Sequence, residues 1–342
     1  MSNSESGDPP TASHQDGLNT TTEMNQTIND RAGCKVCGGM EGYNRIFDRL
    51  DKCRTCGFIT FRDFDEQALL DIYGDDYFAG AEYPDYVGQQ DAMRKSMRRH
   101  LKQMDGYNPN RGSLLEVGCA YGLFLDEAKT HYECVAGVDI CETPIAYAKQ
   151  KLGLNVQCKG FQEIDFGDQR FDVICLWDTV EHLSAPEAYL EKAAHLLNKG
   201  GMVFLTTGDI GSFNARLRGP NWRQIHPPSH LHYFSKDTIT RLLNRLELEV
   251  VGIETATYYH TAFNVFASLR LRRGIGSRIA SWSLALLGEK LARRLGIWIN
   301  LGDIMFVAAQ LKEAAHSRQS GNDGNSVWLP QDRTASQSYR AS

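Results

Sequence analysis

Residues 114–122 read Leu-Leu-Glu-Val-Gly-Cys-Ala-Tyr-Gly, a short apolar run that breaks into closely spaced small residues. An amphipathic segment follows at once, so the pattern indicates a strand, a tight turn and a helix. Glycine at positions 118 and 122 lets the backbone turn sharply and approach a ligand, and the following helix offers unpaired N–H groups. The stretch therefore predicts a site for a nucleotide-like ligand.

A second apolar run, residues 134–140, follows one helix later and contains Asp139 near its end. A carboxylate at the end of such a strand can accept hydrogen bonds from both hydroxyls of a ribose. Folds that bind dinucleotides and folds that bind S-adenosylmethionine (SAM) share this geometry. The spacing alone leaves both classes open.

The rest of the chain alternates between strand and helix patterns. We expect Asn198 to Gly201 to end a helix that begins near Ala185, and Ser235 to cap a helix that runs to about Leu246. Such alternation favours a parallel sheet with helices on both faces. The predicted strands are residues 114–117, 134–140, 154–158, 171–177, 202–207, 247–257 and 304–309.

Composition limits the partners and the location. The 342 residues carry a net charge of −5, and residues 1–30 hold five acidic and no basic residues, so the remainder is nearly neutral. A nucleic-acid partner is therefore not expected. No apolar run approaches the ~18 to 20 residues of a membrane span and no signal-peptide pattern opens the sequence, so we expect a cytoplasmic protein. In that reducing compartment the nine cysteines should be metal ligands or buried thiols.

Four cysteines have the spacing of a metal site. Cys34 and Cys37 form one Cys-x-x-Cys pair, and after fifteen intervening residues Cys53 and Cys56 form a second. Two such pairs place four thiolates tetrahedrally around zinc and leave no open position for chemistry, which predicts a structural zinc ribbon. The segment between the pairs has no net charge, which further disfavours RNA binding.

The pattern divides the chain into five parts. Residues 1–30 and 313–342 are expected to be disordered tails, and residues 31–62 the ribbon. Residues 63–109 form a cap or linker that ends in a helix over 92–104, and residues 110–312 form the main domain. The linker is dense in aromatic and acidic side chains that can cap a pocket or pack on the next domain: Tyr73, Asp76, Tyr77, Phe78, Tyr83 and Tyr86.

Together the motifs resemble those of class I SAM-dependent methyltransferases. The matching stretches are Glu116-Val-Gly-Cys-Ala-Tyr-Gly122, Asp139, Phe171 to Asp178, Glu181-His-Leu183, Leu197 to Gly201 and His230 to Ser235. The resemblance covers about residues 110–312 and implies an α/β fold with a Rossmann-like, seven-stranded, mostly parallel sheet. The ribbon resembles the zinc-binding amino-terminal region of some sugar and natural-product methyltransferases. A Rossmann dehydrogenase is disfavoured because it lacks the later motifs.

The resemblance also implies residues that bind SAM. The first motif lines the methionine part, and the family usually has glycine where this chain has Ala120. Asp139 matches the ribose-binding acid. An acidic residue usually lies near the adenine, but here Phe161 and Gln162 take that place, so we expect stacking and a backbone hydrogen bond. The cofactor-binding set is Glu116, Gly118, Ala120, Gly122, Asp139, Phe161, Gln162 and Asp178.

Methyl transfer to a hydroxyl requires an aligned acceptor and removal of its proton. Asp178, Glu181 and His182 stand at i, i+3 and i+4, so a helix beginning there would place them on one face. His182 is a candidate general base because its pKa lies near working pH. We expect His230 to complete the catalytic set.

A metal is a second interpretation of the same residues. The Asp-x-x-Glu-His arrangement resembles the Glu-x-x-Glu-His site of some magnesium-dependent O-methyltransferases, with His226, His230 or His232 as a further ligand. Mg²⁺ would chelate vicinal hydroxyls and lower the pKa of the acceptor. In many metal-free members a similar Glu-His-Leu only packs or caps, so a structural role is the third interpretation.

Two further segments bear on the acceptor and partners. Residues 221–232 contain three histidines, a tryptophan and an arginine, which suit a polar, ring-bearing acceptor such as a sugar; the alternative is that His230 and Tyr233 tie this loop to the core. Residues 262–298 carry seven basic residues and one acid, with leucines at helical spacing and Trp282 and Trp298. Such a basic amphipathic helix can lie on an anionic membrane surface, and a core-facing or dimer-facing helix is the alternative.

The sequence thus predicts a SAM-dependent methyltransferase with structural zinc. The expected acceptor is a hydroxyl or carbon of a small polar molecule, chiefly a nucleotide- or lipid-linked sugar or a natural product. Metal-assisted O-methylation of a vicinal diol, or of a catechol or quinone precursor, is one alternative. A zinc-ribbon protein that binds a macromolecular partner, with a degenerate or macromolecule-directed SAM fold, is another. A homodimer and contact with the inner membrane face both fit residues 262–298.

Overall fold

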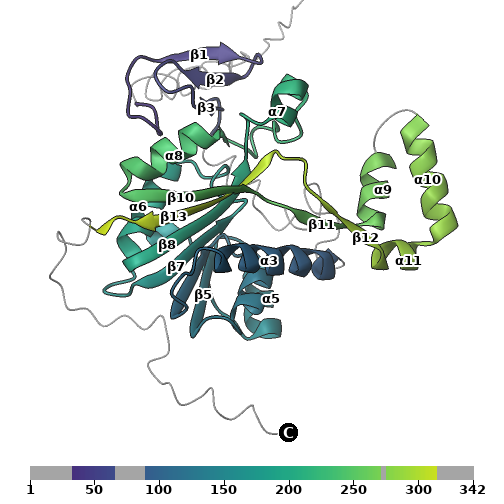
Figure 1. Ribbon diagram of the computed structural model, residues 1–342, viewed down its shortest axis with the longest axis horizontal. Helices are drawn as coiled ribbons and strands as arrows, with labels where there is room; N and C mark the ends of the chain where they lie inside the picture. Colours follow the sequence, from purple (N-terminus) through teal and green to yellow (C-terminus); the bar gives the residue numbers. More distant parts are fainter. Residues whose placement is uncertain (1–32, 66–88, 271–274, 314–342) are drawn as a thin grey trace, which may run out of the picture.

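The computed structural model describes residues 33–65, 89–270 and 275–313, and a central sheet organises them (Figure 1). Its strand order is β10-β13-β8-β7-β4-β5-β6, and β13 runs antiparallel to both of its neighbours. This confirms the predicted seven-stranded, mostly parallel, Rossmann-like sheet. The strands are β4 (Ser113–Val117), β5 (Cys134–Asp139), β6 (Asn155–Cys158), β7 (Phe171–Trp177), β8 (Leu197–Gly208), β10 (Leu248–Thr255) and β13 (Ile304–Leu311).

Helices cover both faces of the sheet. On one face lie α3 (Gln90–Asp105), α4 (Leu123–Ala128) and α5 (Glu142–Leu152), and on the other α6 (Pro186–Leu196) and α8 (Lys236–Arg245) (Figure 1). Successive strand residues supply the two layers in turn: Leu114 joins the α3–α5 core and Leu115 joins the α6–α8 core. The central strands, such as β7, are therefore rich in apolar residues because both of their faces are buried.

Local signals set most helix ends, with one correction. The capping box at the start of α8, in which Ser235 and Thr238 exchange side-chain to backbone hydrogen bonds, confirms the predicted start. Helix α6, however, ends at Leu196, and residues 197–201 belong to β8. Leu197 pairs with Phe171 and Met202 with Val173, so residues 198–201 bulge out of the ladder. The prediction that residues 198–201 end a helix is therefore wrong, because pairing with β7 extends the strand through them.

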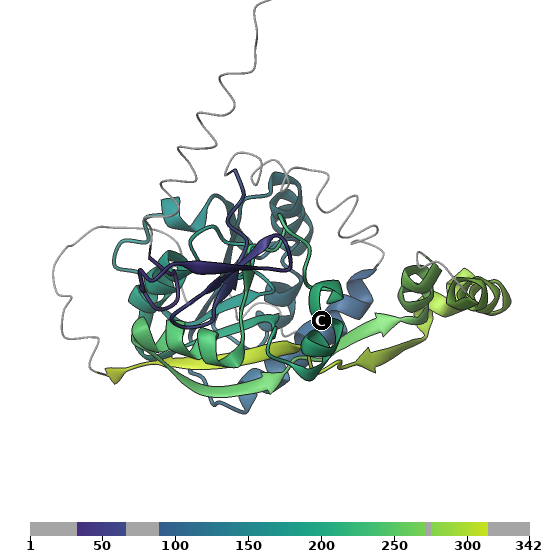
Figure 2. The ribbon, with the colours of Figure 1, turned by 90° about the horizontal axis from the view of Figure 1, so that it is seen from above.

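The ribbon (residues 33–61) shares a sheet with the main domain. Strands β1 (Tyr43–Ile46), β2 (Leu50–Cys53) and β3 (Ile59–Thr60) are antiparallel, and β3 pairs with β9 (His232–Tyr233). The ribbon lies on the side of α6 and α8 (Figures 1 and 2), where Val36 and Phe58 join their core. It is therefore packed against the sheet domain rather than tethered to it.

An arm (residues 258–299) projects from the body of the molecule (Figures 1 and 2). The hairpin of β11 (Tyr258–Thr261) and β12 (Gly296–Ile299) leads to α9 (Ala262–Arg270), α10 (Ile275–Leu287) and α11 (Glu289–Arg294). The leucine stripe predicted as one helix is thus divided, because Gly288 with φ of +72° separates α10 from α11, and Trp298 lies in a strand. In the described part of the chain no helix is long and apolar enough to cross a membrane.

Several predictions fall on residues outside the described ranges. They concern the acidic tail at residues 1–30, most of the segment at 63–88 with its aromatic side chains, and nearly all of the tail at 313–342.

The remaining short elements are the 3-10 helices η2 (Phe161–Glu163) and η3 (Gly219–Asn221) and the helix α7 (Phe213–Arg218).

Candidate active site

The loop after β4 is shaped by residues with positive φ. Gly118 has φ of +76°, Ala120 +44° and Gly122 +70°. A β carbon on Gly118 would lie 2.7 Å from Oγ1 of Thr179, in the loop after β7. The backbone can follow this path only because Gly118 has no side chain. The predicted cofactor loop therefore lies where β4 and β7, the two adjacent strands at which the strand order reverses, both end.

Asp139, at the end of β5, holds this loop closed. Its Oδ2 accepts a hydrogen bond from the Ala120 N–H at 2.8 Å, and its Oδ1 accepts one from the Cys141 N–H at 2.9 Å. Burial raises the pKa of Asp139, and the two N–H donors oppose that rise. Each carboxylate oxygen has a second lone pair, so both can accept a further hydrogen bond from a ligand.

Glu116 is a buried carboxyl group with an unused acceptor. It is 4 % exposed, and its Oε2 has no hydrogen-bond partner in the structure. Burial, and then the nearby Asp139, raise the pKa of Glu116 well above its usual value. A buried polar atom without a partner is costly, so this oxygen fits a site where a ligand supplies the donor.

The two residues expected near the adenine differ in exposure. Gln162 is exposed, whereas the Phe161 ring is 2 % exposed and packs against Phe166 and Tyr189. Nζ of Lys192 donates to the Phe161 carbonyl at 2.7 Å and lies 5.1 Å from the ring centroid. Phe161 is thus a core side chain in this structure. Its stacking on adenine stays a prediction that requires the ring to be uncovered.

Asp178 follows β7 in a bend with φ of +46°, so the helix expected over residues 178–182 is absent from this stretch. The Asp178 carboxylate instead accepts hydrogen bonds from Thr206 Oγ1 at 2.8 Å and from the Tyr258 hydroxyl at 2.8 Å. Tyr258 belongs to the arm and was missed by the sequence analysis. Nothing local marks it, because only the folded hairpin brings β11 to the end of β7.

Three of the predicted catalytic side chains come together without that helix. Ligand atoms of Glu181, His182 and His230 all lie within 4.8 Å of one another. Glu181 and His182 lie in a turn after β7, and His230 lies two residues before β9. We call these three residues the Glu181 cluster. Asp178, expected as a ligand in the same set, lies outside it.

Backbone carbonyl groups orient the two imidazoles of the cluster. Nδ1 of His182 lies 2.8 Å from the Ser229 carbonyl oxygen, and Nδ1 of His230 lies 3.0 Å from that of Gln224. A ring nitrogen this close to a carbonyl oxygen carries the hydrogen, which directs lone-pair character to Nε2. The other two candidate ligands take different positions: the His226 ring packs against that of His230 at 3.8 Å between centroids, tilted by 42°, and His232 contacts the ribbon.

Two members of the cluster, Glu181 and His230, favour their uncharged forms. Burial, and then the nearby Asp178, raise the pKa of Glu181 to about 8, and its Oε2 is buried without a partner. Burial, and then His182 and His226, lower the pKa of His230 to about 2. A carboxylate and two imidazoles at this spacing match the donor set of a divalent cation, which would stabilise the ionised Glu181.

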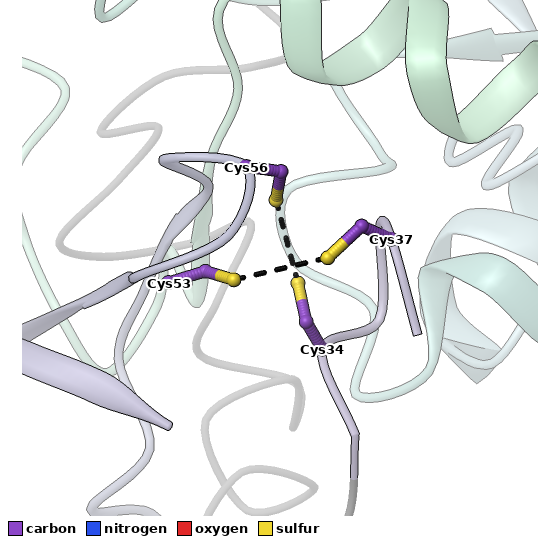
Figure 3. A group of neighbouring side chains, drawn as sticks. All are labelled: Cys34, Cys37, Cys53 and Cys56. Atoms are coloured by element: carbon purple, nitrogen blue, oxygen red, sulfur yellow. Dashed lines mark hydrogen bonds between the residues drawn. The ribbon is translucent and has the colours of Figure 1, made fainter. Parts of the chain in front are cut away.

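The four cysteines of the ribbon converge on one point (Figure 3). Sγ of Cys34 lies 3.6 Å from Sγ of Cys56, and Sγ of Cys37 lies 3.8 Å from Sγ of Cys53. Four sulfurs arranged tetrahedrally at the usual Zn–S distance of about 2.3 Å would be about 3.8 Å apart. The spacing therefore fits a zinc ion.

Comparison with known proteins places the chain in a family. Residues 90–253 match the family model described as a methyltransferase domain. The ubiquinone biosynthesis O-methyltransferase of Coxiella burnetii is 30% identical over 172 residues, which cover 45% of this chain and 70% of the relative. The chain belongs to the SAM-dependent methyltransferases. Membership sets aside the alternative of a partner-binding protein with a degenerate fold.

Further relatives of this methyltransferase include a Bradyrhizobium protein, also named ubiquinone biosynthesis O-methyltransferase. It is 28% identical over 170 residues, which cover 46% of this methyltransferase and 66% of the relative. Among solved structures, the magnesium protoporphyrin IX methyltransferase of Synechocystis is 12% identical with a TM-score of 0.45. That match covers 72% of this methyltransferase and 100% of the Synechocystis chain.

Proposed function

We propose that this methyltransferase methylates a hydroxyl oxygen of a small acceptor that carries two neighbouring hydroxyls. The observation that carries the proposal is the Glu181 cluster, whose carboxylate and imidazoles meet beside the end of β7. A divalent cation held there would bind both hydroxyls and lower the pKa of the one to be methylated. This arrangement replaces a strong general base.

Groups in and around the cofactor loop have unused hydrogen-bonding capacity that fits SAM. The unpartnered Oε2 of Glu116 suits the ammonium group of the methionine part, and Gly118 lets the backbone approach it. Asp139 retains acceptor capacity for the ribose hydroxyls. SAM, when bound, supplies a methyl group on a sulfonium. The protein's part is to align the acceptor oxygen and to ease the loss of its proton.

The donor set bears on which cation this site would take. Mg²⁺, which the sequence analysis named for the metal interpretation, prefers oxygen ligands, whereas His182 and His230 contribute two nitrogens. Imidazoles suit zinc, iron and other transition metals. The carbonyls of Ser229 and Gln224 would hold the rings for binding through Nε2. We therefore favour a transition metal over Mg²⁺.

The relatives support oxygen as the accepting atom. The proteins from Coxiella burnetii and Bradyrhizobium are both named O-methyltransferases of ubiquinone biosynthesis. Together with the Glu181 cluster, this favours a catechol-type diol over the sugar expected from residues 221–232. A sugar with vicinal hydroxyls uses the same chemistry and is the alternative acceptor.

The experiment combines a product screen with metal analysis on the full chain. Methyl-labelled SAM is offered with catechols, matched monohydroxy phenols and vicinal sugar diols, and metal per chain is measured. We expect methylated catechols and two metal ions per chain, one of which is lost in Glu181→Gln with at least a tenfold fall in kcat. The exposed His195 on α6 gives the control His195→Asn, which should change neither.

Two outcomes would overturn the metal assignment. One is a single metal ion per chain that is unaffected by Glu181→Gln. The other is full activity of Glu181→Gln alongside loss of activity in His182→Asn, which would make His182 a general base. Methylation of monohydroxy phenols at the same rate as catechols would remove the requirement for a diol.

We further infer that the ribbon holds a structural zinc ion. The observed sulfur spacing supports it, and so do the matching turns that close each pair: the Gly38 N–H donates to the Cys34 carbonyl and the Gly57 N–H to the Cys53 carbonyl. Four thiolates saturate a tetrahedral ion, so this zinc takes no part in chemistry.

The arm is the proposed contact with an anionic membrane surface. On α10, Arg278, Trp282 and Leu286 recur at every fourth residue and are exposed, the last two at 79 % and 87 %. Residues 262–298 carry a net charge of +6. Exposed apolar side chains next to basic ones suit the boundary between lipid headgroups and acyl chains.

A further inference from the structure

We propose that the ribbon is a brace for the Glu181 cluster, and that Thr60 and His232 are the positioning residues through which it acts. The idea rests on the proposed function for the chemical role of the cluster. The structural basis of the proposal is a continuous path of contacts from the cysteines to Glu181 and His230. That path can be followed in three steps.

The first step runs from the second cysteine pair into β3. The Cys53 N–H donates to the Phe58 carbonyl at 2.8 Å, and the Gly57 N–H donates to the Cys53 carbonyl at 3.0 Å. The buried Phe58 ring lies 5.5 Å from the His232 ring and 5.2 Å from that of Phe234. A metal that fixes the cysteine pair therefore also fixes where β3 begins.

The second step crosses from β3 to β9. Thr60 is paired with His232, and the Phe61 N–H donates to the Leu231 carbonyl at 2.7 Å. Oγ1 of Thr60 lies 3.0 Å from Nδ1 of His232. Nε2 of His232 lies 2.9 Å from the Leu183 carbonyl oxygen, so the hydrogen must be on Nε2 and Nδ1 accepts from the threonine hydroxyl. One tautomer of His232 thus joins the ribbon to the turn after β7.

The third step reaches the cluster itself. The N–H groups of Leu231 and His232 both donate to the Glu181 carbonyl, at 2.9 and 3.1 Å. His230 is the residue directly before Leu231, and the Ser229 carbonyl beside it orients His182. The segment paired with the ribbon therefore provides one member of the cluster and orients the other two.

The first cysteine pair makes a second attachment to the same turn. Nζ of Lys35, between Cys34 and Cys37, donates to the Ser184 carbonyl at 2.7 Å and lies 3.7 Å from a Glu187 carboxylate oxygen. The cofactor loop is held differently, by Asp139 and by the Val138 carbonyl. The brace should therefore act on the acceptor side of the reaction and leave SAM binding unchanged.

The test compares Thr60→Val, which removes the hydroxyl but keeps the shape, with Thr60→Ser, which keeps the hydroxyl. In the full chain with zinc in the ribbon, we measure kcat, acceptor KM, the SAM Kd by calorimetry and hydrogen exchange of the amides of residues 181–183 and 229–233. Loss of an outer hydrogen-bond partner typically costs 10- to 100-fold in metal affinity or activity. We expect Thr60→Val to lower kcat at least tenfold and to speed exchange in both segments, with the SAM Kd within twofold of wild type.

Thr60→Ser should restore kcat and exchange protection. Unchanged kcat and exchange in Thr60→Val would overturn the brace, as would a parallel loss of SAM affinity, which would show general destabilisation. Hydrogen exchange does not depend on which acceptor or metal is used. If wild type fails to methylate diols while Thr60→Val still speeds exchange at the cluster, the proposed function fails and the brace stands.

Discussion

At the scale of single residues, the cofactor loop depends on the missing side chain at position 118. In Gly118→Ala the new methyl group would meet Thr179 at 2.7 Å, and a positive φ costs an L-residue roughly 1–2 kcal/mol. We expect at least a tenfold loss of SAM affinity, measured by calorimetry. Gly153→Ala is the control, because Gly153 also has positive φ, +63°, but no atom lies within 4 Å of the added carbon.

The control variant should lose stability and keep its SAM affinity. A Gly118→Ala protein that binds SAM as wild type does would show that the approach to Thr179 is not required. It would also weaken the assignment of this loop to the cofactor.

Tyr258 provides the second test at this scale. Its hydroxyl donates to the Asp178 carboxylate at 2.8 and 3.0 Å in a partly buried site, and a hydrogen bond to a charged group contributes about 1.5–3 kcal/mol. We expect Tyr258→Phe to lower the free energy of unfolding by about that amount, measured with urea. The adjacent Tyr259→Phe is the control, because Tyr259 contributes chiefly its ring, over which Lys95 lies at 4.0 Å. Equal losses in the two variants would remove the special role of the Asp178 contact.

Site residues could be predicted from the sequence when they lie close together along the chain. The motif at Glu116 to Gly122 and Asp139 lie within one β-α-β unit, so spacing alone brought them together. Glu181 and His230 are far apart in sequence, and only the resemblance to the family grouped them. The role of Tyr258 had no sequence signal at all, since it depends on how the arm folds back.

At the scale of elements, Asp303 joins the start of β13 to the segment around α7 and η3. Its carboxylate accepts hydrogen bonds from Asn214 at 2.7 Å, Trp222 at 2.9 Å and Arg223 at 3.0 Å. Burial opposes ionisation of Asp303, but these donors outweigh it and lower its pKa. The contact therefore stabilises the fold above the unfolded pKa of about 3.9 and is lost as pH falls through the lower folded pKa.

The variant Asp303→Asn tests whether this contact stabilises the fold at neutral pH and ceases to do so in acid. We expect a loss of roughly 3–5 kcal/mol in the free energy of unfolding that is constant from about pH 8 to 5 and shrinks below about pH 4. Asp105→Asn is the control, because its ion pair with Arg111 is nearly half exposed and should contribute under about 1 kcal/mol. A loss at Asp303 that grows as the pH falls would contradict the assignment.

Elements of the sheet were predictable because buried strands are mostly apolar, as β7 is apart from Asp172, and the helices between them carry clear starts such as Ser235. The errors arose where tertiary pairing competes with a local pattern. Residues 198–201 look like a helix end but bulge from β8, and residues 178–182 have helical spacing but form a turn. The leucine stripe of the arm gave the right period but could not show that Gly288 would break it.

At the scale of the whole molecule, the ribbon and the arm lie on different parts of the sheet domain (Figures 1 and 2), and each reaches the predicted catalytic residues by its own contact. The ribbon reaches the Glu181 cluster through β9. The arm reaches Asp178 through Tyr258. Both modules therefore contact residues that follow the end of β7.

The arm yields the last prediction, binding to anionic vesicles. Lipid insertion of Trp282 and Leu286 should contribute about 1.5–3 kcal/mol each, and each basic residue near the surface about 1 kcal/mol. We expect wild type to sediment with phosphatidylserine-containing vesicles but not with neutral ones, and high salt to weaken binding. Trp282→Ala with Leu286→Ala should lower the partition coefficient at least tenfold, whereas the exposed Met40→Ala on the ribbon should not. Equal binding to neutral vesicles would contradict the role of anionic lipid and make α10 a surface for another partner. Conversion of a dimer to a monomer by the double variant would identify that partner as a second copy of this chain.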